Sequence, residues 1–142
     1  MMGALALSIL AATLVPGEPV QIDAALLAGL PEAKATLEAH GKKQVCEGPK
    51  LASVLGRLGV PQGEKLRGPA LAQVIIVRAH DGYEVAFSLG ELDPMLGNSQ
   101  AIIATTCDGH ALAMGEGPYR LIVPGEQRPA RSVRMASSVK LK

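Results

Sequence analysis

The chain has 142 residues, 48% of them apolar but only 2% aromatic, and a net charge of +1. This length suits a single domain with a core of Leu, Val, Ile and Ala, and the scarcity of aromatic rings argues against nucleic-acid modules that stack bases on them. The charge is uneven, because residues 118–142 hold six basic residues and only Glu126 as an acid, a local charge of +5. A basic end on an otherwise acidic chain indicates a local anion site, and the alternative is a solvated basic tail.

The first fifteen residues carry no charge and are mostly apolar. This stretch is too short to span a membrane, so we expect no stable membrane span. It is similar to the apolar region of a signal peptide but lacks the basic start, and the alternative is a first strand over residues 5–14. We assign the ligand-binding domain to residues 16–142, and under either interpretation we expect the chain to be periplasmic or otherwise exported.

Turn residues and apolar periodicity predict short elements in the first half of the chain. The stripe of Leu51, Val54, Leu55 and Leu58 predicts a helix over residues 50–58, which Gly59 and Pro61 end. The other expected elements are a turn at 16–19, a strand at 20–22, a helix at 24–28 capped by Asp23, two short strands at 35–39 and 43–46 joined at His40-Gly41, and a polar loop at 63–69.

The second half of the chain has the pattern of a strand-rich domain. An apolar run at 71–77, the turn Asp81-Gly82 and an alternating run at 83–87 predict a hairpin. Ser88 and Glu91 have the spacing of a capping box that opens a short helical turn. Further strands are expected at 101–106, 119–123 and 133–141, with a turn at Asp108-Gly109. Most connections are short turns, so the predicted fold class is α+β with a mixed, mainly antiparallel sheet and a few short helices.

The cysteines and histidines do not predict a metal site. Cys46 and Cys107 can form one bridge or remain two buried thiols. The three histidines lie in different segments, and their spacing to the cysteines does not supply the four ligands of a structural zinc site. We therefore assign no metal-binding residue.

Three arginines at three-residue spacing, Arg128, Arg131 and Arg134, are the strongest candidates for a ligand site. Arginine forks bind phosphate and carboxylate in a bidentate manner. A helix places all three on one face, a straight strand places Arg131 and Arg134 on opposite faces, and a turn over 128–132 leading into a strand brings two of them together. Backbone N–H groups after Pro124-Gly125 can complete an anion nest. The alternative is surface charge beside a C-terminal strand.

The same segment resembles a known family. Residues 117–125 read Gly-Pro-Tyr-Arg-Leu-Ile-Val-Pro-Gly, and residues 130–134 read Ala-Arg-Ser-Val-Arg. This resembles the end of the sulfite-oxidase-type molybdopterin-binding domain, which typically shows Gly-x-Pro-x-Arg, three hydrophobic residues and Pro-Gly, then Ala-Arg-x-Val-Lys-Trp. Residues 47–51 with the following helix, Asp81-Gly82-Tyr83 and residues 89–93 resemble further elements of the family. The resemblance covers residues 18–142 and is strongest at 117–134.

The resemblance implies that residues 16–142 form a short stand-alone member of this family, which binds the molybdopterin cofactor. Its cofactor-binding residues would be Arg128, Arg131, Ser132 and Arg134. If the domain is an enzyme, the resemblance implies a molybdenum-dependent oxidoreductase. Full-length members hold molybdenum through a cysteine well upstream of the 50–58 helix, and Cys46 lies too close to that helix to be equivalent. The alternative is a non-catalytic module that keeps the fold without cofactor and docks on a redox protein partner.

Overall fold

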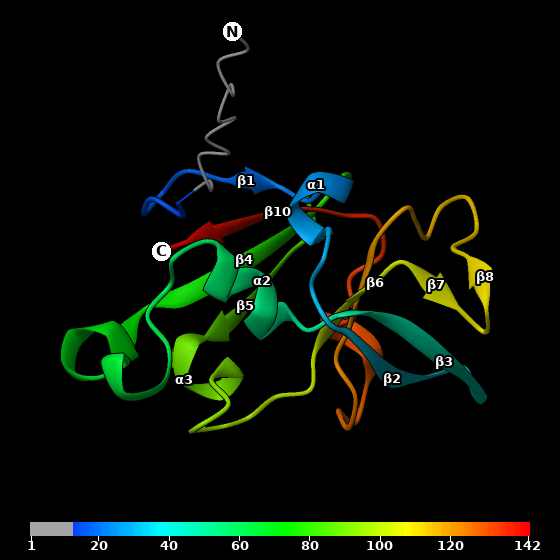
Figure 1. Ribbon diagram of the computed structural model, residues 1–142. Helices are drawn as coiled ribbons and strands as arrows, with labels where there is room; N and C mark the ends of the chain where they lie inside the picture. The colour runs from blue at the N-terminus through cyan, green and yellow to red at the C-terminus, as the bar shows by residue number, and fades with distance from the viewer. Residues whose placement is uncertain (1–12) are drawn as a thin grey trace, which may run out of the picture.

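The computed structural model describes residues 13–142, and Figure 1 shows short helices packed around several small antiparallel sheets. The predicted α+β class is confirmed. The strands are divided among three sheets rather than gathered in one mixed sheet, and every pairing within the described residues is antiparallel. Most of the signal-like segment lies outside the described residues, so both interpretations of it remain predictions. Leu14 is buried, and its N–H donates to the carbonyl of Leu58 at 2.9 Å.

The first sheet forms one wall of the larger core. Its strand order is β1 (Val20–Gln21), β10 (Ala136–Leu141), β4 (Val74–Ala79) and β5 (Glu84–Ser88). The 80–83 turn joins β4 to β5 as predicted, and the register sets Ile75 opposite Phe87 and Val77 opposite Val85. Alternate side chains of a strand point to opposite faces, so these four residues line the buried face together.

The second sheet is built on a long hairpin, with the strand order β2 (Glu32–Ala39), β3 (Lys42–Pro49), β7 (Thr106–Cys107) and β8 (His110–Ala111). Both residues of the hairpin turn, His40 and Gly41, have the positive φ that a tight hairpin turn requires. The strands predicted at 35–39 and 43–46 were too short. The additional residues of both strands include charged side chains on the exposed face. In the sequence alone, such charged positions look like loop, because the burial of the opposite face is not visible.

The third sheet consists of β6 (Ile102–Ala104) and β9 (Arg120–Ile122), and all its residues are buried. A bend at Thr105 divides the strand predicted at 101–106, so that β6 pairs with β9 while β7 pairs with β3. Residue 48 must be glycine because a Cβ there would lie 1.9 Å from the carbonyl oxygen of Ile103. This close approach sets β3 directly against β6.

The helices are short, and the caps predicted from sequence are present. Asp23 Oδ1 accepts a hydrogen bond from the N–H of Leu26 at 2.8 Å, and Ser88 and Glu91 form the expected capping box. The helices are α1 (Ala24–Leu27), α2 (Leu51–Arg57) and α3 (Leu89–Leu92), with 3₁₀ turns η1 (Gly63–Lys65), η2 (Gly68–Ala72) and η3 (Pro129–Arg131). The strand predicted from residue 71 begins only at Val74, because η2 occupies the preceding residues.

Two hydrophobic cores meet at the third sheet. On β6, Ile103 faces the larger core while its neighbour Ile102 faces the smaller one. On β9, Leu121 and Ile122 divide in the same way. The larger core contains α1, α2, α3 and the first sheet, and the smaller one lies under the β2–β3 hairpin. The β6–β9 pair is therefore the partition that holds the two halves of the domain together.

A disulfide joins Cys46 on β3 to Cys107 on β7 inside the smaller core. The two residues are direct partners across the antiparallel pair, with Cα atoms 4.0 Å apart. Of the two states open at the level of sequence, one bridge or two thiols, the structure has the bridge. Within residues 13–142, no helix is both long and apolar enough to cross a membrane.

We predict that replacing both cysteines by serine lowers the free energy of unfolding by about 4 kcal/mol, because a bridge across this span removes much chain entropy from the unfolded state. The sequence separation of the two cysteines is 61 residues. Urea unfolding of the oxidised protein and the double variant measures the difference. Reduced wild-type protein is the matched control and should approach the variant; a loss below about 1 kcal/mol contradicts the prediction.

Candidate functional site

Arg131, the central residue of the predicted site, is surrounded by acceptors from the protein itself. Its guanidinium donates to Glu126 at 2.6 and 3.1 Å, to Glu91 at 3.1 and 3.3 Å, and to the carbonyl of Ala86 at 3.0 Å. It also lies over the Phe87 ring, 4.4 Å from the ring centre. The hydrogen bonds to Glu126 and then to Glu91 raise the pKa of Arg131 above its ordinary value. We call these residues, Arg131 with Glu91, Glu126 and Phe87, the Arg131 cluster.

The Arg131 cluster is a structural joint. Glu91 Oε1 accepts from the N–H of Ser88 as part of the capping box and also from Arg131, so one carboxylate holds both the start of α3 and the η3 turn. Glu126 belongs to the loop after β9. The guanidinium therefore ties the C-terminal segment to β5 and α3, and its donors are already engaged.

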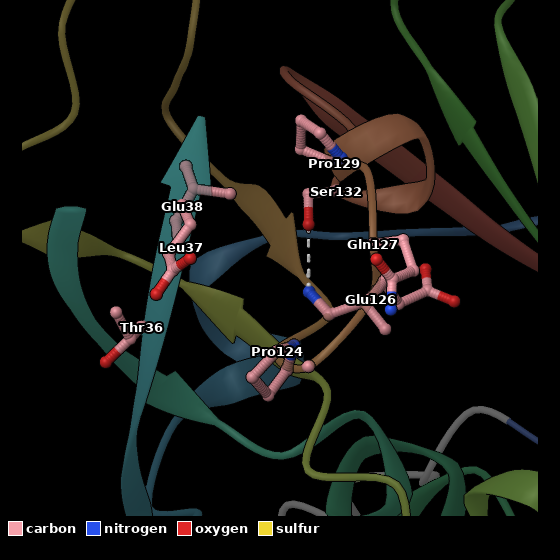
Figure 2. Close-up of a pocket in the computed structure, with 10 residues that line it drawn as sticks. Thr36, Leu37, Glu38, Pro124, Glu126, Gln127, Pro129 and Ser132 are labelled. Carbon is pink, nitrogen blue, oxygen red and sulfur yellow. Dashed lines mark hydrogen bonds between the residues drawn. The ribbon is translucent and has the colours of Figure 1, made fainter. Parts of the chain in front are cut away.

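The other predicted residues have different surroundings. Ser132 is buried, and its Oγ accepts from the N–H of Val123 at 3.0 Å, the bond drawn in Figure 2. Arg128 is exposed just before η3 and takes part in none of the hydrogen bonds or ion pairs found within residues 13–142. Arg134 is exposed in the turn that precedes β10. After the turn at 129–131, Arg131 and Arg134 therefore have different surroundings, and only Arg131 contacts Glu91 and Glu126.

Arg134 instead lies near Arg120, a residue of the buried strand β9. The Arg120 side chain is only 5% exposed, and its Nε has no hydrogen-bond partner in the described part of the chain. Its Nη1 lies 3.5 Å from Glu116 Oε1. Burial lowers the pKa of Arg120, the Glu116 carboxylate opposes that shift, and the positive charge of Arg134 adds to it. The two arginines are therefore close enough to repel each other.

Two adjoining hollows share Ala39, His40, Arg120 and Arg134, and we call them together the basic hollow. The larger part, about 570 Å³, faces the β2–β3 hairpin, and the smaller part, about 250 Å³, faces Tyr83. The remaining polar side chains of the larger part are Lys42, Lys43, Gln44, Asp108 and Glu116. Asp81 lines the smaller part. The four cations of the whole hollow exceed its three carboxylates by one, which favours an anion only slightly.

The chemistry of the basic hollow follows from Arg120. A buried guanidinium normally has acceptors for its N–H groups, because an unpaired buried donor or charge is costly. Phosphate and carboxylate oxygens are the acceptors that a guanidinium binds most strongly, and Arg134 can contribute a second fork. An anion bound in the basic hollow would supply the hydrogen-bond acceptor that Arg120 Nε lacks in the described part of the chain.

A further hollow of about 310 Å³ lies between β2 and the loop that follows β9. Figure 2 shows Glu38 on β2 facing Glu126, Gln127 and Pro129 across it. Its charged lining residues are both carboxylates, and Glu126 is already paired with Arg131. This hollow does not suit an anion. The basic hollow is chosen as the candidate site because it is lined by Arg120, whose buried Nε has no partner in the described part of the chain.

The sequence prediction and the candidate site overlap in part. Arg134 and Ser132 line the basic hollow, whereas Arg128 and Arg131 do not. Sequence reasoning missed Arg120 and His40. Two signals for Arg120 were available: its place in the 117–125 motif and its charge inside the apolar run 119–123. No local signal placed the His40 turn beside it.

Neither cysteine is free to serve as the molybdenum ligand that the resemblance implies. Their sulfurs are bonded to each other, and neither lines the basic hollow. Over residues 13–142, no group of three or more His, Cys, Asp or Glu side chains is arranged to hold a metal ion. The anionic pterin part of such a cofactor does suit the basic hollow, because Arg120 Nε has no hydrogen-bond partner in the described part of the chain.

Comparison with known proteins does not extend the resemblance. A scan against models of protein families found no match to this chain, and a search of curated proteins found none either. The likeness to molybdopterin-binding domains therefore remains a prediction.

We predict that Arg131→Met lowers the free energy of unfolding by about 2 kcal/mol, because it removes the cation–π contact and leaves two carboxylates facing each other. Partial exposure of both ion pairs limits the loss through solvent screening. Arg128→Met is the matched control and should change stability by less than about 0.5 kcal/mol. Chemical denaturation measures both, and equal effects would contradict the structural role of Arg131.

Proposed function

We propose that this domain binds an anionic ligand of the molybdopterin type, a phosphorylated pterin, in the basic hollow. The observation that carries the proposal is the buried guanidinium of Arg120, whose Nε lacks any partner in the described part of the chain. Arg134 supplies a second positive charge on the same hollow. The family resemblance supports the choice of ligand, since its Arg120-containing motif and the 130–134 segment both contribute lining residues.

The lining of the basic hollow supports a ligand with a charged end and a flat end. Tyr83 lines the smaller part with its ring half exposed, and its hydroxyl donates to the carbonyl of Ala130 at 2.7 Å. That hydrogen bond fixes the ring, so a planar group can lie against it. Arg120 and Arg134 would then bind the phosphate at the junction of the two parts.

The chain's own contribution is binding and orientation. A molybdopterin cofactor, when bound, supplies oxygen-atom transfer chemistry at its metal, but this chain offers no free thiolate as a metal ligand. Any metal chemistry would therefore need a ligand other than a thiolate of this chain, from an unidentified residue or from a partner. A disulfide is typical of proteins outside the reducing cytosol, which supports the proposal that the domain is exported.

The second candidate function is docking on a redox protein without cofactor. One observation favours it: Leu71 and Leu96 are both exposed and lie side by side over Gly90, with the exposed Met95 next in sequence. A Cβ at residue 90 would lie 3.8 Å from Leu96 Cδ1 and 3.9 Å from Leu71 Cδ2. An apolar surface of this kind is typical of protein contacts.

Pterin content decides between the two functions. We expect protein purified from a host that makes molybdopterin to retain pterin, measured by fluorescence after release, alongside molybdenum by elemental analysis. Arg134→Gln and Arg120→Lys should each reduce retained pterin by about tenfold or more, because each removes charge-assisted hydrogen bonds. Arg128→Gln removes one positive charge outside the basic hollow, and this variant should retain as much pterin as the wild-type protein.

Two results would contradict the proposed function. The first is folded wild-type protein that carries no pterin, which favours the docking function. The second is undiminished pterin in both basic-hollow variants, which would place the ligand elsewhere. Circular dichroism of each variant shows that the fold is intact.

A further inference from the structure

We propose that Glu116 is an internal competitor that occupies Arg120 until an anionic ligand displaces its carboxylate. The inference rests on the proposed function, because it concerns the same basic hollow. It adds that the affinity of this site is set by a carboxylate of the chain itself, and that the ligand must be anionic enough to replace it.

The contact between Glu116 and Arg120 is loose. Glu116 Oε1 lies 3.5 Å from Arg120 Nη1, whereas Arg131 meets Glu126 at 2.6 Å and Glu91 at 3.1 Å with several hydrogen bonds. Arg120 Nε remains unpaired although the carboxylate is near. The Glu116 carboxylate therefore neutralises the arginine without saturating its donors, which distinguishes Arg120 from Arg131.

The Glu116 side chain can leave while its backbone stays in place. The N–H of Glu116 donates to Ala113 at 3.0 Å, and its carbonyl accepts from the N–H of Met135 at 2.8 Å. Both contacts use main-chain atoms. The side chain is 32% exposed and lines the larger part of the basic hollow, so rotation toward solvent opens the arginine without unfolding the turn.

The electrostatic consequence is a penalty on binding. Ligand and carboxylate are both negative and share one arginine, so their repulsion opposes binding unless Glu116 moves away. Two unit charges about 6 Å apart in a partly solvated site interact strongly enough to change an affinity about tenfold. Asp108 also lines the larger part, but its Oδ1 accepts from the N–H of Val45 at 3.0 Å and it forms no ion pair with Arg120 in the described structure.

Asp108 therefore provides a matched control for the test. Glu116→Gln and Asp108→Asn each remove one negative charge from the same hollow while nearly preserving shape. We would titrate wild-type protein and both variants with inorganic phosphate, follow the backbone amide NMR signals and determine Kd. The proposal expects Glu116→Gln to bind phosphate about tenfold more tightly and Asp108→Asn to change Kd by less than about threefold.

The outcomes separate this inference from the proposed function. If wild-type protein binds phosphate and Glu116→Gln binds no more tightly, or if both variants gain equally, the competitor role is overturned while the anion site stands. If no folded form binds phosphate, the anion site and the competitor role fail together. A gain confined to Glu116→Gln that disappears in an Arg120→Lys background supports both.

Discussion

The ion pairs of Arg131 with Glu91 and Glu126 determine what the rest of the C-terminal segment can do. They join the loop after β9, the η3 turn and the start of α3, and they consume the donors of one arginine. Because this guanidinium is satisfied by the protein, it is a poor ligand group. The η3 turn is anchored by Arg131, and Arg134, three residues further on, instead lines the basic hollow together with the buried Arg120.

The candidate site lies where the two halves of the domain meet. The β6–β9 pair has one face in each core, and Arg120 begins β9 at that partition. The β2–β3 hairpin brings His40 from the smaller half, and the turn before β10 brings Arg134 from the larger half. The disulfide holds β3 against β7, close to the hairpin wall of the basic hollow. Stability and site geometry thus depend on the same junction.

Local features were predicted well from the sequence, and long-range ones were not. The Asp23 cap, the Ser88–Glu91 capping box and the α2 stripe depend on residues within one or two helical turns, so their chemistry is visible in the sequence. The sequence located Arg128, Arg131 and Arg134 but could not tell which of them is free to bind a ligand. The reason is that Arg131 bonds to Glu91, which lies forty positions away in the chain. Arg120 gained significance only once its burial and missing partner were known, because neither follows from sequence spacing.

The central claim is that Arg120, not Arg131, is the arginine that receives an anion. Proton–nitrogen NMR spectra of the arginine Nε–H groups, recorded while inorganic phosphate is added, test it most directly. The account predicts that the Arg120 signal shifts and saturates while the Arg131 signal stays in place. A saturating shift at Arg131, or an Arg120 signal that does not respond while phosphate binds elsewhere, would contradict it.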